Sequence, residues 1–228
     1  MPDGGTSDRP LEFRLPAGVG EATWRERGSR FIARAARAED PAAALHLRDG
    51  ERSRYHDATH HVLAARTLGG EVLNDDGEPS GTAARRILVE IERANVYGVA
   101  IVVTRYFGGT KLGTGGLARA YGSAAAAAIE ELATVRGVTA RVMTVRFAYA
   151  DTGVVMRALD ASDARRRSAR YAEESELELG VPVAQCPELA ARLVELTAGR
   201  ARITFGDELV LETGDDGGEI EAEFGART

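Results

Sequence analysis

The sequence predicts a two-domain α+β protein, and three observations lead to this fold class. Stretches typical of strands and of helices alternate along the chain. The 228 residues suit one large domain or two small ones, at about 150 residues per domain. After Gly137 the order becomes strand, helix, one or more strands, helix and strand, which indicates a ferredoxin-like sandwich. The expected parts are a flexible N-terminus at 1–20, an N-terminal domain at 21–137, a ferredoxin-like C-terminal domain at 138–213 and an acidic flexible tail at 214–228.

The N-terminal domain shows helix signals between apolar stretches. Asp40 before Pro41 is typical of a helix start, because the acid caps the helix and proline suits its first position. Ser80 or Thr82 is expected to cap a second helix, and Asn95 to end it. The stretch 99–106 is almost continuously apolar, which predicts a central strand of a sheet. The predicted strands are 24–38, 61–68 and 99–106, and the predicted helices are 40–49, 84–94 and 117–133.

The C-terminal domain shows a similar mixture of signals. Asp151 and Thr152 are expected to cap a short helix, and Pro187 to open a second one. Gly206 with Asp207 predicts a hairpin or a bent strand near the end of the domain. The predicted strands are 138–150, 167–179 and 201–213.

Composition and charge exclude several classes of protein. Hydrophobic residues make up 44% and charged residues 28%, which is an ordinary globular balance. No apolar run approaches the roughly 18 residues of a membrane span, and the N-terminus lacks the order of a secretory signal. The single cysteine, Cys186, has no internal disulfide partner and is expected to be inert. These features predict a cytoplasmic protein. Residues 1–137 carry no net charge, and residues 138–228 carry the whole net charge of −6. Neither half is therefore basic enough to bind nucleic acid by charge alone, although a local basic patch is still possible.

The most unusual stretch is RYFGGTKLGTGGLARAYG at 105–122, with six glycines between a buried strand and a helix. Bare amides at a helix N-terminus near basic side chains are typical of an anion site, and phosphate is the expected group. Lys111 is the only lysine among the 29 basic residues. Tight packing and sharp turns also need glycine, so a structural role stays open. The candidate binding residues are Arg105, Tyr106, Gly108, Gly109, Lys111, Gly113, Gly115, Gly116 and Arg119.

A second stretch, NDDGEPSGTA at 74–83, carries three carboxylates in four residues. One interpretation is a cation or partner site. The other is a solvated loop that caps the next helix, since turns favour these residue types. The candidates for a wall facing the glycine-rich stretch are His60, His61, Asp75, Asp76, Glu78 and Ser80.

Other ligand motifs fit poorly. The residues Gly113, Gly115 and Ala118 match a relaxed form of the dinucleotide-binding motif. They lie well beyond the end of the strand, however, and no suitable βαβ unit follows. Thr114 stands where a Walker-type loop has lysine. His56 and His60 have a spacing seen in metal sites, yet His60 and His61 enter a strand. A hydrogen-bonded buried histidine is therefore expected, with no metal and no cofactor.

These residues resemble the IMPACT family in its prokaryotic, YigZ-like two-domain form. The likeness rests on Ser29-Arg30-Phe31-Ile32, on His60-His61 and on the two long stretches, 74–83 and 105–122. It covers the N-terminal half to about residue 135, and the C-terminal half matches by element order. Gly28 departs from the family, which often has lysine there.

The resemblance implies an N-terminal domain similar to the second domain of ribosomal protein S five, with a left-handed βαβ crossover. It implies a ferredoxin-like C-terminal domain similar to the last domain of elongation factor G. Both folds recur in translation factors and RNA-binding proteins, and eukaryotic relatives restrain the amino-acid-starvation kinase. No settled enzymatic activity accompanies the prokaryotic members.

Three functional hypotheses follow. We favour a non-enzymatic binding or regulatory protein of translation or its stress control, which binds an anionic partner through the glycine-rich loop. That partner is RNA, the ribosome or an acidic protein surface. The alternative is an enzyme for a nucleotide or phosphorylated metabolite, with Asp75, Asp76 and Glu78 holding Mg²⁺ or acting as base. The third hypothesis is a scaffold whose loops only shape the fold.

Overall fold

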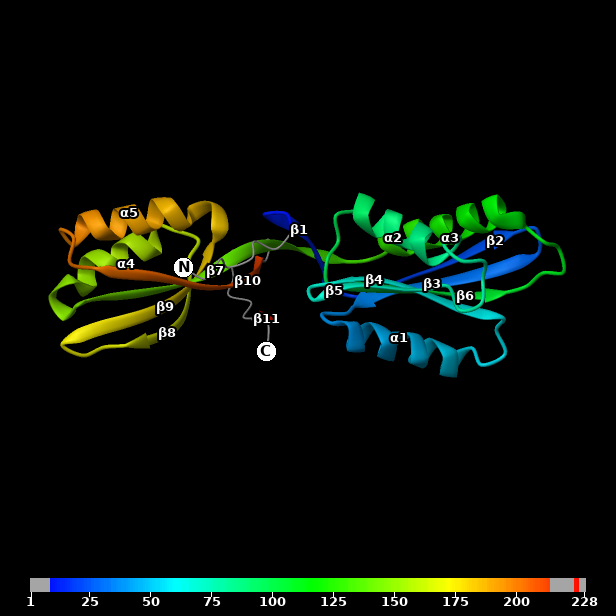
Figure 1. Cartoon of the computed structure of the whole chain (residues 1–228), viewed down its shortest axis with the longest axis horizontal. Helices are drawn as coiled ribbons and strands as arrows, with labels where there is room; N and C mark the ends of the chain where they lie inside the picture. Colours follow the sequence, from blue (N-terminus) through cyan, green and yellow to red (C-terminus); the bar gives the residue numbers. More distant parts are fainter. Residues whose placement is uncertain (1–8, 214–223, 226–228) are drawn as a thin grey trace. The chain divides into compact units, whose positions relative to one another are not determined.

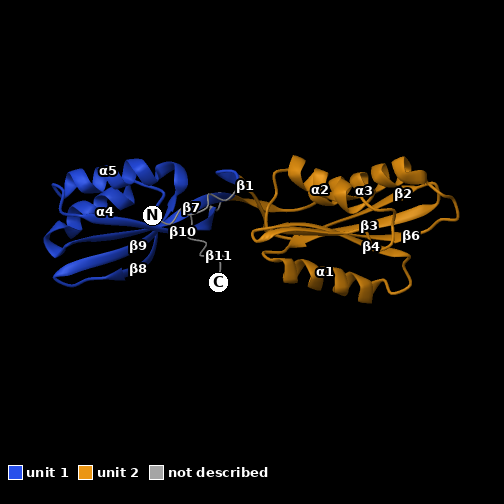
Figure 2. Ribbon diagram, viewed as in Figure 1, with its two compact units in different colours: residues 1–12, 137–228 blue, residues 13–136 orange. Residues whose placement is uncertain are grey.

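The computed structural model describes residues 9–213 and 224–225. The chain forms two units, residues 13–136 and residues 1–12 with 137–228 (Figure 2). Both units combine helices with a sheet, so the predicted two-domain α+β fold class is confirmed. Within the described residues, no helix is both long and apolar enough to cross a lipid bilayer.

The N-terminal unit is a five-stranded antiparallel sheet with helices on both faces (Figure 1). Its elements are β2 (Gly20–Glu26), β3 (Ser29–Arg37), α1 (Pro41–Arg54), β4 (His60–Thr67), β5 (Gly70–Asn74), α2 (Ala84–Arg93), β6 (Val99–Tyr106) and α3 (Gly113–Glu130). The strand order is β2-β3-β6-β4-β5. Helices α2 and α3 cover one face and α1 covers the other. Because β3 and β4 both run antiparallel to β6, they are parallel to each other and α1 forms the crossover between them.

Strand β6 is the centre of this sheet, as its apolar sequence predicts. Every residue from Val99 to Arg105 is buried. Ile101 and Val103 pack in the core cluster that contains α2 and α3, whereas Val102 packs in the cluster that contains α1. Burying each such side chain contributes about 1.5–3 kcal/mol, so the strand fixes both layers at once.

Two strands of the N-terminal unit differ from the sequence prediction. The stretch predicted as one strand at 24–38 is a hairpin of β2 and β3, turned at Arg27 and Gly28. Both turn residues have positive φ, 44° and 82°. Strand β5 lies in the stretch predicted as a loop, where it pairs with β4 along the edge of the sheet.

The helix ends follow the sequence signals only in part. Asp40 caps α1 by accepting a hydrogen bond from the Ala43 amide at 2.7 Å, and Asn95 follows α2 with φ of 51°, as predicted. The prediction that Ser80 or Thr82 caps α2 is wrong, because the cap residue is Ala83 and it offers no side-chain bond. Helix α3 begins at Gly113, one turn earlier than predicted.

The C-terminal unit has the predicted ferredoxin-like order. Its elements are β7 (Thr134–Ala148), α4 (Thr152–Asp160), β8 (Arg165–Arg170), β9 (Glu174–Pro182), α5 (Cys186–Leu196), β10 (Arg202–Thr213) and β11 (Phe224–Gly225), with short 3₁₀ turns at Tyr149–Asp151 and Val183–Gln185. The strand order β11-β10-β7-β9-β8 places the first and third strands of the motif in the centre. Helices α4 and α5 cover one face (Figure 1). Strand β1 (Glu12–Pro16) pairs with β7.

Several expectations for the C-terminal unit need correction. The stretch predicted as one strand at 167–179 is the hairpin of β8 and β9. Of the two alternatives predicted near Gly206, a hairpin or a bent strand, the hairpin is absent from the described residues, since β10 runs through Gly206 as one strand. Asp151 makes no cap bond and instead accepts two bonds from Arg200, at 2.6 and 3.1 Å. Cys186 is buried in α5, and burial raises the pKa of its thiol, in agreement with an inert role.

The two predicted flexible ends fall partly outside the described residues. Of the N-terminal stretch 1–20, residues 1–8 lie outside, and the remainder contains the ordered strand β1. Of the acidic tail 214–228, only Phe224–Gly225 is described, and these residues form β11 against β10.

Candidate functional site

Three stretches singled out in the sequence meet at one end of the N-terminal sheet. His60 begins β4 and lies directly opposite Arg105 at the end of β6. The loop between β5 and α2 brings Glu78 to the same place. There Glu78 Oε1 accepts hydrogen bonds from Arg105 Nη1 at 2.6 Å and from the Tyr121 hydroxyl of α3 at 2.8 Å. One carboxylate therefore links the acidic loop, the central strand and the helix.

This cluster is buried. The side chains of Glu78 and Arg105 are only 4% and 6% exposed. The Arg105 guanidinium also lies over the rings of Phe31 and Phe107, 5.5 and 5.6 Å from their centroids. Burial, and then the Glu78 carboxylate, raise the pKa of Tyr121, so its hydroxyl stays protonated and donates. The sequence predicts that Arg105 binds an anionic ligand. In the structure its guanidinium instead forms an internal ion pair with Glu78.

The second carboxylate, Asp75, caps α2. Its Oδ1 accepts from the amides of Ala83 and Ala84 at 3.2 and 2.8 Å, and its Oδ2 accepts from the Gly81 amide at 2.8 Å. The amides of Ala83 and Ala84 stand at the start of the helix and have no partner within it, whereas the Gly81 amide lies in the loop just before it. The structure therefore gives Asp75 the capping role that one sequence interpretation assigned to this loop as a whole.

We expect Asp75→Ala to lower the free energy of unfolding of the N-terminal domain by about 1–2 kcal/mol, because helix amides lose their acceptor. Trp24 in β2 is the only tryptophan, so its fluorescence during urea unfolding reports on this domain. Asp75→Asn keeps an acceptor oxygen and should lose less. A loss of the same size in Ser80→Ala, with none in Asp75→Ala, would assign the cap to Ser80.

The third carboxylate, Asp76, ties the acidic loop to the histidine pair. Its Oδ1 accepts from Arg52 Nη2 at 2.5 Å and its Oδ2 from the His61 amide at 2.6 Å. Its carbonyl oxygen lies 2.7 Å from Nδ1 of the half-buried His60. His61 is buried with Nδ1 3.1 Å from Thr104 Oγ1, and burial lowers the pKa of its imidazole. A hydrogen-bonded buried histidine is thus found as predicted, and no group of three potential metal ligands occurs among the described residues.

The glycine-rich loop between β6 and α3 has an anchored half. Gly108 crosses the β2–β3 turn so closely that a Cβ on it would lie 1.9 Å from the carbonyl carbon of Gly28. The Phe107 amide donates to Thr59 Oγ1 at 3.1 Å, and the Gly108 amide donates to Ser29 Oγ at 3.2 Å. These two amides are engaged, so they are not available to a ligand.

The other half of the loop is open. Gly109 and Gly113 have φ of 83° and 68°, and a Cβ at either would meet nothing within 4 Å. The cap residue of α3 is Leu112, which provides no side-chain bond to the first amides of the helix. Lys111 and Arg119 are exposed and have no ion-pair partner in the described part of the chain. The features expected of an anion site are therefore found here rather than around Arg105.

The remaining candidates lie around these two clusters. Tyr106 donates to Asp57 Oδ1 at 2.7 Å, and this bond raises the pKa of its phenol. The Arg30 guanidinium lies 4.4 Å from the centroid of the Tyr106 ring. The candidates left lie in the exposed part of the acidic loop or in the first turn of α3: Ser80, Gly115 and Gly116.

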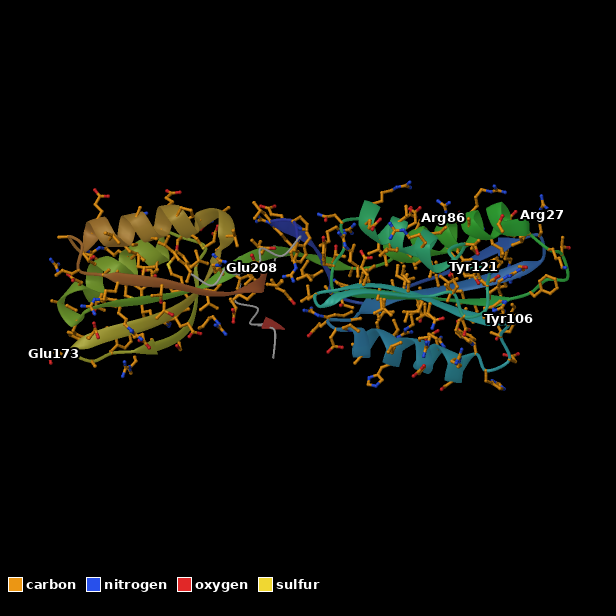
Figure 3. The ribbon with its side chains drawn as sticks, viewed as in Figure 1. Arg27, Arg86, Tyr106, Tyr121, Glu173 and Glu208 are labelled. Atoms are coloured by element: carbon orange, nitrogen blue, oxygen red, sulfur yellow. The ribbon has the colours of Figure 1, made fainter. Side chains whose placement is uncertain are left out.

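The structure adds residues that the sequence analysis missed. Arg86 and Arg93 of α2 line a groove between α2 and α3 that continues from Arg119. Figure 3 shows Arg86 on the helical layer and Tyr121 between that layer and the sheet. The signal for the arginines was their spacing of seven residues, which places them on one face of a helix. The signal for Tyr121 was a tyrosine on a helix rich in alanine, since a buried tyrosine hydroxyl needs a partner.

Known proteins share both the motifs and the domain order. The Impact N-terminal domain family matches residues 27–129, and the family described as "Domain of unknown function (DUF1949)" matches residues 145–200. The IMPACT family member YigZ of Escherichia coli K12 is 30% identical over 188 residues, which cover 79% of this chain and 91% of YigZ. The chain belongs to the IMPACT family.

Other IMPACT proteins agree with this assignment, and two solved structures resemble the chain in fold. YvyE of Bacillus subtilis is 32% identical over 188 residues, covering 81% of this chain and 86% of YvyE. A Thermus thermophilus member is 46% identical over 101 residues, covering 44% of this chain and 55% of its own. A crystal structure of a hypothetical protein has a TM-score of 0.60 at 28% identity and covers 85% of this IMPACT chain and 97% of its own. A crystal structure from Thermus thermophilus, with a TM-score of 0.51 at 15% identity, covers 92% of this chain and 31% of its own and shows likeness of fold alone.

Proposed function

We propose that this IMPACT protein is a non-enzymatic binding protein of translation or its stress control, acting in the cytoplasm on an anionic partner. The partner binds at the open half of the glycine-rich loop. One observation carries the proposal: Lys111 and Arg119 are exposed, without ion-pair partners among the described residues, beside the uncapped start of α3. Helix N-terminal amides and nearby cations together favour a phosphate or carboxylate group.

The acidic loop supports this assignment because its carboxylates already have partners within the domain. Asp75 is held by backbone amides, Asp76 is paired with Arg52, and Glu78 is paired with Arg105. The loop can therefore lie near an anion site without presenting to the ligand a carboxylate that lacks hydrogen-bond partners. Its role in binding is to hold the end of β6 and the adjoining helix in place.

The same contacts weigh against the enzymatic alternative. Holding Mg²⁺ or accepting a proton from a substrate requires carboxylate oxygens that face the ligand. Glu78 is buried, and the Asp75 oxygens accept three backbone bonds. The geometry thus supports binding through backbone amides and cations better than catalysis by this loop.

Co-sedimentation with ribosomes across a salt series tests the proposal. We expect the full chain to pellet with ribosomes at low salt and to dissociate as salt rises. Lys111→Ala combined with Arg119→Ala should weaken the association by about tenfold or more, because two phosphate-neutralising charges are lost. A matched control, Arg25→Ala with Arg85→Ala, removes two exposed arginines outside the loop and should bind as the wild type does. Wild-type protein that stays in the supernatant at low salt, or equal losses in both double variants, would refute the proposal.

A further inference from the structure

An open groove with a volume of about 550 Å³ runs between helices α2 and α3, on the helical layer of the N-terminal unit. Helix α2 lines it with residues at helical spacing i, i+3, i+4 and i+7, namely Arg86, Val89, Glu90 and Arg93. Helix α3 lines it with Gly115, Ala118, Arg119, Gly122, Ser123 and Ala126. The α3 side spans about 16 Å at 1.5 Å per residue, so the groove is a track rather than a pocket for one small group.

The charge of this groove is positive and only partly compensated. Glu90 pairs with Arg93 at 3.2 Å. Arg86 and Arg119 are exposed and have no ion-pair partner among the residues that the structure describes. The three guanidinium groups exceed the one carboxylate, so an anionic occupant gains charge-assisted hydrogen bonds, which arginine forms with phosphate in a bidentate manner.

The lining also indicates which kind of anion fits. The α3 wall consists of Gly, Ala and Ser apart from Arg119, so a slender chain can approach the helix backbone closely. None of the residues that line the groove is aromatic, and Val89 is its only larger apolar side chain. Protein interfaces depend on buried aromatic or large apolar anchors, and single-stranded RNA sites depend on aromatic stacking. A helical nucleic acid backbone requires neither, because it is bound through its phosphates and its shape.

We propose that the α2–α3 groove binds the sugar–phosphate backbone of double-helical RNA, without reading its sequence. This inference rests on the proposed function, because Arg119 belongs to both the open half of the loop and the groove. It adds the ligand class, a continuous polyphosphate rather than a single phosphate group. It also adds Arg86 and Arg93 as phosphate-binding residues.

Fluorescence anisotropy with RNA hairpins of about 20 base pairs, in two unrelated sequences, tests the inference at several salt concentrations. We expect both hairpins to bind the full chain alike. Arg86→Ala with Arg93→Ala should weaken binding about tenfold or more and reduce the slope of log affinity against log salt by about 2, one unit for each lost phosphate contact. Ser123→Glu, which places a carboxylate on the groove wall and removes no arginine, should weaken binding as well.

Two matched controls separate the groove from general charge. Arg85→Ala removes an exposed arginine of α2 outside the groove, and Ser53→Glu adds a carboxylate on α1, which covers the opposite face of the sheet. Both should bind the hairpins as the wild type does. Trp24 fluorescence verifies that each variant is folded.

The outcomes distinguish the groove from the proposed function. Groove variants that bind RNA normally, while the Lys111 and Arg119 double variant loses ribosomes, would overturn the inference and leave the function standing. Stronger binding of polyglutamate or of single-stranded RNA than of the hairpins would also overturn it. If the wild type binds neither hairpins nor ribosomes, both proposals fail.

Discussion

Glu78→Ala is expected to lower the free energy of unfolding of the N-terminal domain by about 3–5 kcal/mol, because it leaves a buried guanidinium without its counter-charge. Arg105 is 6% exposed and sits on the central strand, so it cannot turn to solvent without disturbing β6. Tyr121 would lose its acceptor at the same time. The loop carrying Glu78 would then lose its attachment to both the strand and α3.

Urea unfolding followed by Trp24 fluorescence measures this effect in the domain concerned, since Trp24 pairs with Phe31 in the β2–β3 hairpin. Glu78→Gln keeps an acceptor for Arg105 and Tyr121 but removes the charge, and it should fall between Glu78→Ala and the wild type. Glu71→Ala on the exposed edge strand β5 removes one carboxylate at the surface and should change stability by less than about 0.5 kcal/mol.

A double variant tests whether the loss comes from the unpaired charge. Glu78→Met with Arg105→Met removes both charges and fills similar volume, so it should be more stable than Glu78→Ala. If Glu78→Ala and Glu71→Ala have equal effects, or if the double variant is the least stable of all, Glu78 and Arg105 do not form a coupled ion pair.

The predictable parts of this fold are those in which neighbouring residues hold the whole signal. Asp40 before Pro41 caps α1, and Pro187 lies in the first turn of α5, because cap and proline preferences act within one helical turn. The apolar run of β6 predicts a central strand because a strand between two helical layers buries both faces. Element order indicated the ferredoxin-like half, although it did not distinguish the β8–β9 hairpin from a single strand.

Glycines carried less information, because their role depends on distant neighbours. Gly206 beside Asp207 is typical of a turn, yet β10 continues through it, and a Cβ there would lie 3.3 Å from Val142 Cβ. The β2–β3 hairpin, by contrast, turns at Arg27, which has a positive φ that non-glycine residues adopt only rarely. No local pattern separates these two cases.

The three stretches that the sequence singled out do meet in the structure, but the roles of the residues within this meeting were not predictable. Arg105 and Glu78 are 27 residues apart, and they pair only because the loop before α2 folds over the end of β6. The neighbours of Arg105 in the sequence form a glycine-rich loop, and this local pattern alone predicts that Arg105 is an exposed cation. Whether an arginine serves a ligand or an internal carboxylate is decided by tertiary packing, which a single sequence does not display.

Gly108→Ala is expected to destabilise the N-terminal domain by about 3 kcal/mol or more, the upper end of overpacking effects, because its methyl group meets backbone rather than a movable side chain. The new Cβ would lie 1.9 Å from the carbonyl carbon of Gly28, 2.2 Å from its oxygen and 2.3 Å from the Ser29 nitrogen. Relief requires the loop and the β2–β3 turn to separate, which also breaks the bond from the Gly108 amide to Ser29 Oγ.

Two other glycines of the same loop and helix provide matched controls. Gly109→Ala meets no atom within 4 Å, but it holds alanine at a φ of 83°, so it should cost only about 1–2 kcal/mol. Gly115→Ala lies within α3 with Arg119 Nη1 as its nearest neighbour at 3.8 Å, and it should be neutral or stabilise the domain by up to about 1 kcal/mol. Urea unfolding by Trp24 fluorescence should therefore rank the variants Gly115→Ala, Gly109→Ala, Gly108→Ala from most to least stable. If Gly108→Ala is as stable as Gly109→Ala, the loop does not cross the turn at this distance, and the anchor that holds the open half beside α3 must be sought elsewhere.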